Sequence, residues 1–134
     1  MKHHAICLAA FVSLISCAPT EKGSTAAGIT PIPTYPHSPV IVSEFTGKLS
    51  YENGCLLFRN TRGQQFVPIW PNDSAFDGRR ITVAIPGRPA KTLTVGREIR
   101  IGGSAQQWGN VPASPGLGDT ASRCTATPYF VAEV

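Results

Sequence analysis

Apolar and polar residues alternate along several short segments of the chain, a pattern typical of half-buried β-strands. In residues 41–50, Ile41, Phe45 and Leu49 share one face of an extended chain, and mostly polar residues share the other. Comparable β-prone segments are residues 55–59, 65–70, 80–85, 92–101 and 124–134. The pattern therefore predicts about six short strands.

Turn-forming residues separate these segments. Asn53-Gly54 accepts the positive φ angles of a type I′ turn, so the strands on either side of it should pair antiparallel. Gly96-Arg97 predicts a bulge or bend inside the segment 92–101, and Gly102-Gly103 predicts its end.

Composition supports a β-rich fold. Charged residues make up 15% of the chain, below the roughly 25% usual in soluble domains, while 13 Gly and 12 Pro supply many turns. No segment keeps a helical period over about ten residues. With 134 residues, we expect one domain with an all-β fold, a small antiparallel barrel or sandwich of about six strands. An OB-like barrel is the first expectation.

Residues Ser104 to Ser122 form a long stretch without a strand or helix pattern inside the predicted domain. The stretch contains Gly, Pro and one tryptophan, Trp108. Loops of this length are often functional, and a rigid aromatic side chain suits the binding of a protein or glycan. The alternative is a loop that folds back so that Trp108 covers the hydrophobic core.

The N-terminus has the layout of a secretory signal. Lys2 precedes an apolar run from Ala5 to Val12, which is shorter than the roughly 20 residues needed to cross a membrane. The residues Leu14, Ser16 and Cys17 in Leu14-Ile15-Ser16-Cys17 then resemble the bacterial lipobox. This resemblance predicts cleavage before Cys17 and attachment of acyl chains to that cysteine, which would anchor the protein firmly.

Lipidation would place the protein in the bacterial cell envelope. Ala18 resembles the sorting signal that directs Gram-negative lipoproteins to the outer membrane, so we expect the domain to face the periplasm from there. The expected divisions are a signal peptide, residues 1–16; a lipidated Pro-rich tether, residues 17–39; and a β-domain, residues 40–134. For residues 29–35 the alternative is an extended edge segment packed on the domain.

Two cysteines remain in the predicted domain. Cys7 leaves with the signal and Cys17 carries lipid, so Cys55 and Cys124 are left in an oxidising compartment. We expect them to form a disulfide that joins an early strand to the last one. A catalytic or metal-binding pair lacks support, since the CxxC spacing is missing and the mature chain has only His37.

The domain offers little for catalysis. A Ser-His-Asp or Cys-His site needs an imidazole beside the nucleophile, and His37 lies in the predicted tether. Asp73 and Asp77 are the only close carboxylate pair, but such loop residues more often cap turns. Their spacing also differs from that of a calcium loop. We therefore expect a protein that is not an enzyme and that uses no metal or cofactor.

The mature chain is basic. Loss of Lys2 leaves 11 of the 12 Lys and Arg against 8 Asp and Glu. Six of these cations cluster in the second half of the chain, namely Arg79, Arg80, Arg88, Lys91, Arg97 and Arg100. Guanidinium groups suit phosphate and carboxylate, so Arg97 and Arg100 are candidate binding residues for an envelope polyanion, together with Trp108 and Trp70. The alternatives are a solvated basic face and a Trp70 that packs over the end of the barrel. Nucleic acid is not an expected partner in the envelope.

Beyond the lipobox, three motifs resemble small β-rich lipoproteins of unassigned function in bacterial envelopes. They are Gly54-Cys55-Leu56-Leu57, Ile69-Trp70-Pro71, and the stretch from Val95-Gly96 to Gly102-Gly103. The resemblance implies location and fold, but no functional residues. We expect a lipid-anchored, non-enzymatic binding module for an envelope protein or cell-wall polymer. The alternatives are a structural or assembly subunit of an outer-membrane or periplasmic complex and an inhibitor of a wall-degrading enzyme.

Overall fold

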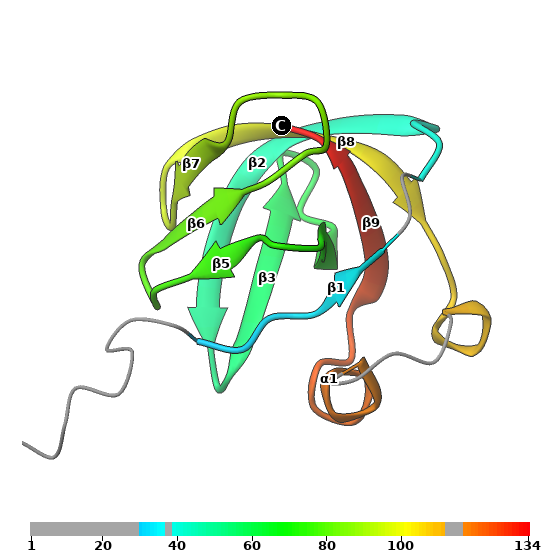
Figure 1. Ribbon diagram of the computed structural model, residues 1–134. Coiled ribbons are helices and arrows are strands. Elements are labelled where there is room, and N and C mark those ends of the chain that lie inside the picture. Colours follow the sequence, from blue (N-terminus) through cyan, green and yellow to red (C-terminus); the bar gives the residue numbers. More distant parts are fainter. Residues whose placement is uncertain (1–29, 37–38, 112–116) are drawn as a thin grey trace, which may run out of the picture.

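The computed structural model describes residues 30–36, 39–111 and 117–134. The predicted signal peptide, Cys17 and His37 lie outside these residues. Most of the described chain is β-strand, with one short helix (Figure 1). The elements are β1 (Thr34–Tyr35), β2 (Ser43–Glu52), β3 (Cys55–Asn60), β4 (Gln65–Pro71), β5 (Ala75–Phe76), β6 (Arg80–Val83), β7 (Lys91–Thr94), β8 (Glu98–Ala105), a 3-10 turn (Trp108–Asn110), α1 (Leu117–Arg123) and β9 (Thr127–Glu133).

Strands β2, β3, β4, β8 and β9 form a closed barrel. β2, β3 and β4 are consecutive antiparallel neighbours, and β8 pairs with the other side of β2. β9 lies between β8 and β4, and its parallel pairing with β4 closes the ring. The fold is therefore all-β, and this closed five-stranded barrel is the OB-like architecture that the sequence predicts.

A second sheet of three strands, in the order β5-β6-β7, lies across the front of the barrel in Figure 1. Its inward side chains Ile81, Val83 and Leu93 belong to the same buried cluster as Phe58 and Ile101 of the barrel. Burial of each such side chain contributes about 1.5–3 kcal/mol to folding. The two sheets therefore enclose one hydrophobic core.

The turn between β2 and β3 is the predicted type I′ turn. Asn53 and Gly54 have φ angles of 52° and 79°. Because a two-residue turn fixes the register of its hairpin, the strands pair with Glu52 opposite Cys55. The predicted strand 41–50 is displaced by two residues, because β2 covers Ser43–Glu52.

The prediction of one strand over residues 92–101 is wrong. The bend at Gly96, whose φ is 84°, is sharp enough to send β7 and β8 into different sheets. Gly102-Gly103 does not end the strand but lies within β8. A Cβ atom at Gly103 would stand 1.8 Å from the carbonyl oxygen of Phe130. Glycine at this position therefore permits the close approach of β9 rather than a turn.

Residues Ser104 to Ser122 contain more regular structure than predicted. They include the end of β8, the 3-10 turn Trp108–Asn110 and most of α1. A helix of seven residues makes two turns, which is too short to leave a clear helical period in the sequence.

Packed structure begins before Val40, where we expected the domain to start. β1 pairs in parallel with the end of β4, and Thr30 forms an isolated bridge with Phe76. Tyr35 is buried, and its hydroxyl donates a hydrogen bond to the carbonyl oxygen of Val131. The described residues 30–35 are therefore not a free tether. They form an edge segment packed on the domain, which is the alternative prediction for residues 29–35.

Candidate functional site

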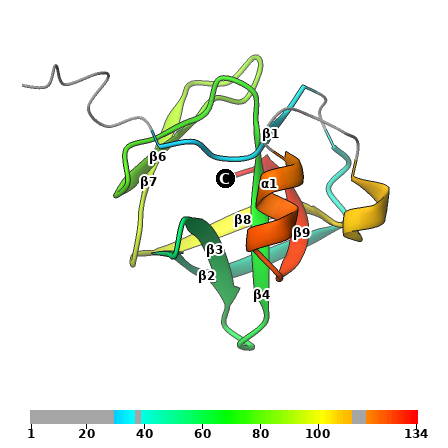
Figure 2. The same cartoon turned by 90° about the horizontal axis from the view of Figure 1, so that it is seen from below.

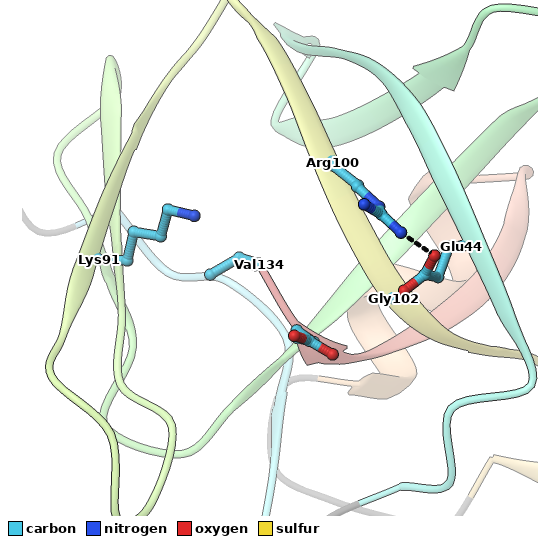
Figure 3. Close-up of a pocket in the computed structure, with 6 residues that line it drawn as sticks. Glu44, Lys91, Arg100, Gly102 and Val134 are labelled. Carbon is cyan, nitrogen blue, oxygen red and sulfur yellow. Dashed lines mark hydrogen bonds and ion pairs between the residues drawn. The ribbon is translucent and has the colours of Figure 1, made fainter.

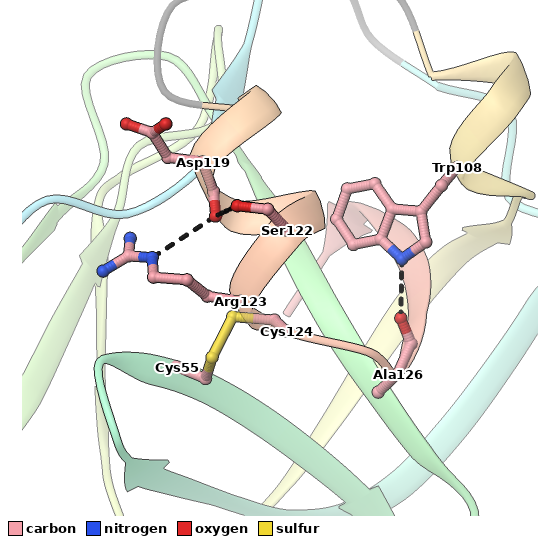
Figure 4. The surroundings of a disulfide bond; sticks show 7 residues. All are labelled: Cys55, Trp108, Asp119, Ser122, Arg123, Cys124 and Ala126. Carbon is pink, nitrogen blue, oxygen red and sulfur yellow. Dashed lines mark hydrogen bonds between the residues drawn. A yellow bond between two sulfur atoms is a disulfide. The ribbon is translucent and has the colours of Figure 1, made fainter.

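Cys55 and Cys124 form the predicted disulfide, with 5.9 Å between their Cα atoms (Figure 4). Cys55 begins β3, and Cys124 directly follows α1. The bond therefore fastens the β8–β9 connection to the β2–β3 hairpin. Both cysteines are buried, as is typical of structural disulfides.

The β8–β9 connection lies on the outer face of β4. We call its described residues between 106 and 126 the cover. Val67 and Ile69 alternate with interior residues along β4, yet they are only 1% and 0% exposed. Leu117 packs in a cluster with Ile69, and Trp108 contacts the clusters of both β4 residues. Figure 2 shows α1 against β4 and β9. OB folds bind ligands on the face of their second and third barrel strands, which are β3 and β4 here, so this face is partly occupied by the chain itself.

Trp108 belongs to this cover. Its side chain is half-buried, and its indole Nε1 donates a 2.9 Å hydrogen bond to the carbonyl oxygen of Ala126 (Figure 4). This is the arrangement of the folded-back alternative. Trp108 does not protrude as a free aromatic anchor.

The prediction that Trp70 is a candidate binding residue is wrong, because its side chain is fully buried. It lies in β4 with 0% exposure, inside the main core cluster. Its indole Nε1 has no hydrogen-bond partner among the described residues. A partner molecule cannot reach this side chain while the barrel is folded, so Trp70 has a role in packing.

Arg97 and Arg100 lie on the β2–β8 side of the barrel. Arg97 is exposed in the turn that leads into β8. Arg100 forms an ion pair and hydrogen bond with Glu44 on β2, which raises the pKa of the arginine. The eight residues of β8 separate Arg97 from Trp108, a span of roughly 25 Å at about 3.4 Å per residue. The structure therefore does not bring Trp108 and the two arginines into one site.

A row of polar residues crosses this same face and was missed from the sequence. Gln65 pairs with Arg59, Arg59 with Lys48, and Lys48 with Glu98, so the row crosses β4, β3, β2 and β8. Lys48, Arg59 and Glu98 are exposed. The Asn53-Gly54 turn could have revealed the Lys48–Arg59 pair, because its register follows directly from a two-residue loop.

Two hollows lie near the end of β9. One is a polar hollow of about 270 Å³ whose lining includes charged side chains of β2, β7 and β8 (Figure 3). It is lined by Glu44, Lys91, Arg100, Gly102, Glu133 and Val134. A second hollow of about 490 Å³ is lined by Ile41, Ile85, Arg88, Asp73 and several prolines, among other residues. The Arg88–Glu133 ion pair, at 3.4 Å, joins a residue of each hollow.

Asp77 caps a turn, which is the role predicted from the sequence as the alternative to a catalytic carboxylate pair. Its Oδ1 accepts hydrogen bonds from the backbone N–H groups of Arg79 and Arg80, at 2.8 and 2.6 Å. These bonds lower the pKa of Asp77. Asp73 has a positive φ of 69° and lines the larger hollow. The described residues hold no group of three or more His, Cys, Asp or Glu side chains suited to a metal ion.

No family model matches this chain, and neither a curated protein nor a solved structure matches it. None of the helices in the described part of the chain is long and apolar enough to cross a membrane.

Proposed function

We propose that this protein is a lipid-anchored, non-enzymatic binding module of the bacterial envelope, held by Cys17 and facing the periplasm from the outer membrane. The lipobox residues Leu14-Ile15-Ser16-Cys17 support the anchor. The disulfide supports an oxidising compartment, because structural disulfides are rare in the cytosol. The ligand is an anionic component of the envelope.

The exposed cations on the outer face of β2, β3 and β8 are the observation that carries the binding proposal. Arg100 lies on this face of β8, Lys48 and Arg59 lie beside it on β2 and β3, and Arg97 is exposed in the turn that leads into β8. The face of β4 with Val67 and Ile69, in contrast, is under the cover. Binding therefore uses the strand face with the cations and not Trp108, which has a packed position.

Fractionation and crosslinking in bacterial cells test this function. Cys17→Ala should move the protein from the membrane to the soluble envelope fraction, and unchanged membrane retention would refute lipid anchoring. A photo-crosslinking residue at position 97 should capture an envelope component, whereas the same residue at position 108 should capture much less. Equal capture from both positions would contradict binding through the β2–β8 face.

A structural or assembly subunit is the second candidate function. Val40 and Val42 are each 75% exposed and Ile41 is 45% exposed. Three consecutive exposed apolar residues are unusual unless a partner covers them. Crosslinking to one defined protein from position 40, with none from position 97, would favour this candidate. The inhibitor alternative needs a protruding loop, whereas among the described residues between 104 and 122 Trp108 and Leu117 pack on the barrel.

A further inference from the structure

We propose that the Lys48–Arg59 pair forms the centre of a phosphate-binding surface. The proposal deepens the function above and rests on it, because it names the ligand chemistry of the same strand face. Its ligand is a phosphate-bearing anion, either a lipid headgroup or a polymer with repeated phosphates.

Lys48 and Arg59 are direct cross-strand partners on β2 and β3. Residues opposite each other in an antiparallel pair point to the same face, with Cβ atoms about 5 Å apart. Both side chains are exposed, while their neighbours Gly47, Leu49 and Phe58 are buried toward the core. The ammonium group of Lys48 and the guanidinium group of Arg59 are therefore neighbours on the solvent-exposed outer face of the barrel.

This pairing places two like charges opposite each other, which destabilises a sheet. The ion pairs within 4 Å among the described residues are Arg80–Asp77, Arg88–Glu133 and Arg100–Glu44. Neither Lys48 nor Arg59 takes part in one. Glu98 lies opposite Lys48 on its other side, in β8, whereas the other cross-strand partner of Arg59 is the neutral Gln65 of β4. An anionic ligand that binds between the two groups would remove the repulsion.

Two further cations extend the surface in both directions. Thr61 donates a 3.0 Å backbone hydrogen bond to Thr46, which brings the adjacent Arg62 to one side of the pair. Gly96 donates a 2.9 Å backbone bond to Leu49, which brings the exposed Arg97 to the other side. The surface is therefore elongated, with its two unpaired strand cations in the middle.

Phosphate fits this arrangement because its oxygens point in several directions and accept charge-assisted hydrogen bonds from more than one donor. A guanidinium group supplies a planar fork, and an ammonium group supplies a compact point charge. The two groups differ in shape and stand side by side, so they can contact different oxygens of one phosphate. Glu98, opposite Lys48 on β8, is the carboxylate of the row and should weaken anion binding.

The test uses the full chain carrying Cys17→Ala, with its disulfide oxidised, so that a lipid anchor plays no part. The probes are inorganic polyphosphate, polyglutamate of similar length, and phosphatidylcholine vesicles with or without phosphatidylglycerol. Lys48→Gln and Arg59→Gln should each weaken polyphosphate binding about fivefold, the effect of one cation near an anionic surface. Glu98→Gln should strengthen it.

Arg123→Gln is the matched control. It removes the same charge from α1, beside the far end of the β2–β3 hairpin, and should leave binding within about twofold of the parent. Arg59→Gln should also leave the protein as stable as the parent or more so, because it relieves the repulsion with Lys48 and its other cross-strand partner, Gln65, carries no charge. A residue with a purely structural role would not show weaker binding together with unchanged or greater stability.

Binding of polyphosphate or of phosphatidylglycerol vesicles that depends on Lys48 supports the proposal, and the probe that binds identifies the source of the phosphate. Equal losses from Lys48→Gln and Arg123→Gln would overturn it, as would no binding to either probe or equal binding to polyglutamate. Crosslinking from position 97 in cells would then still stand as the separate test of the binding module.

Discussion

The indole N–H of Trp108 donates a hydrogen bond to the carbonyl oxygen of Ala126, 2.9 Å away. The same ring packs against the cluster formed by Val67 and the Cys55–Cys124 disulfide. This contact connects the residues that follow β8 to those that precede β9. Position 108 therefore stabilises the cover.

Trp108→Ala should lower the free energy of unfolding by about 2 kcal/mol, because it removes a half-buried aromatic ring and a hydrogen bond. Trp108→Phe keeps most of the packing and should cost only about 1 kcal/mol. Urea unfolding of the oxidised protein measures both values. An unchanged midpoint in Trp108→Ala, together with a loss of captured partner, would instead make Trp108 a binding anchor.

Loss of the disulfide should cost about 4 kcal/mol on the chain-entropy model. The bond closes a loop with a sequence separation of 69, and without it the unfolded chain gains freedom. The double variant Cys55→Ala/Cys124→Ala should show a melting temperature lower by many degrees, measured by circular dichroism. Cys17→Ala is the matched control and should melt like the parent. If the double variant melts at the parent temperature, the bond does not stabilise the domain.

Two Gly→Ala substitutions should have opposite effects on stability. At Gly103 the new Cβ would stand 1.8 Å from the carbonyl oxygen of Phe130, so Gly103→Ala should disrupt the β8–β9 pairing. At Gly118 in α1 nothing lies within 4 Å of a Cβ, so Gly118→Ala should stabilise the helix by about 0.5–1 kcal/mol. Thermal unfolding of both variants checks this pair. A tolerated Gly103→Ala would show that the two strands can separate without loss of the fold.

Asp77 should make stability depend on pH at the acidic end. Its backbone hydrogen bonds with Arg80 and Arg79 lower its pKa in the folded state. The resulting stabilisation is present above the ordinary aspartate pKa and is lost as pH falls through the lowered value. Asp77→Asn cannot ionise, so it should flatten the acid limb of a plot of unfolding free energy against pH. An identical acid limb in parent and variant would contradict this role.

Local features of the sequence determined the β2–β3 hairpin and the disulfide. Asn53-Gly54 has the backbone freedom that a type I′ turn needs, and that turn sets the register that brings Lys48 opposite Arg59. Cys55 and Cys124 followed from the number of cysteines left in the predicted domain. Lipid attachment at Cys17 stays a prediction from its lipobox.

Only the tertiary structure decided which sheet each of the other strands joins and which side chains remain exposed. In the sequence, Gly102-Gly103 suggests the end of a strand, yet β8 continues through both residues, and Gly103 is needed for the close approach of β9. Trp70 and Trp108 each stand in a sequence context that allows a surface role, but β4 and the cover bury one and half-bury the other. Turn geometry depends on a few adjacent residues, whereas burial and strand assignment depend on contacts between segments far apart in the chain, such as β4 and β9.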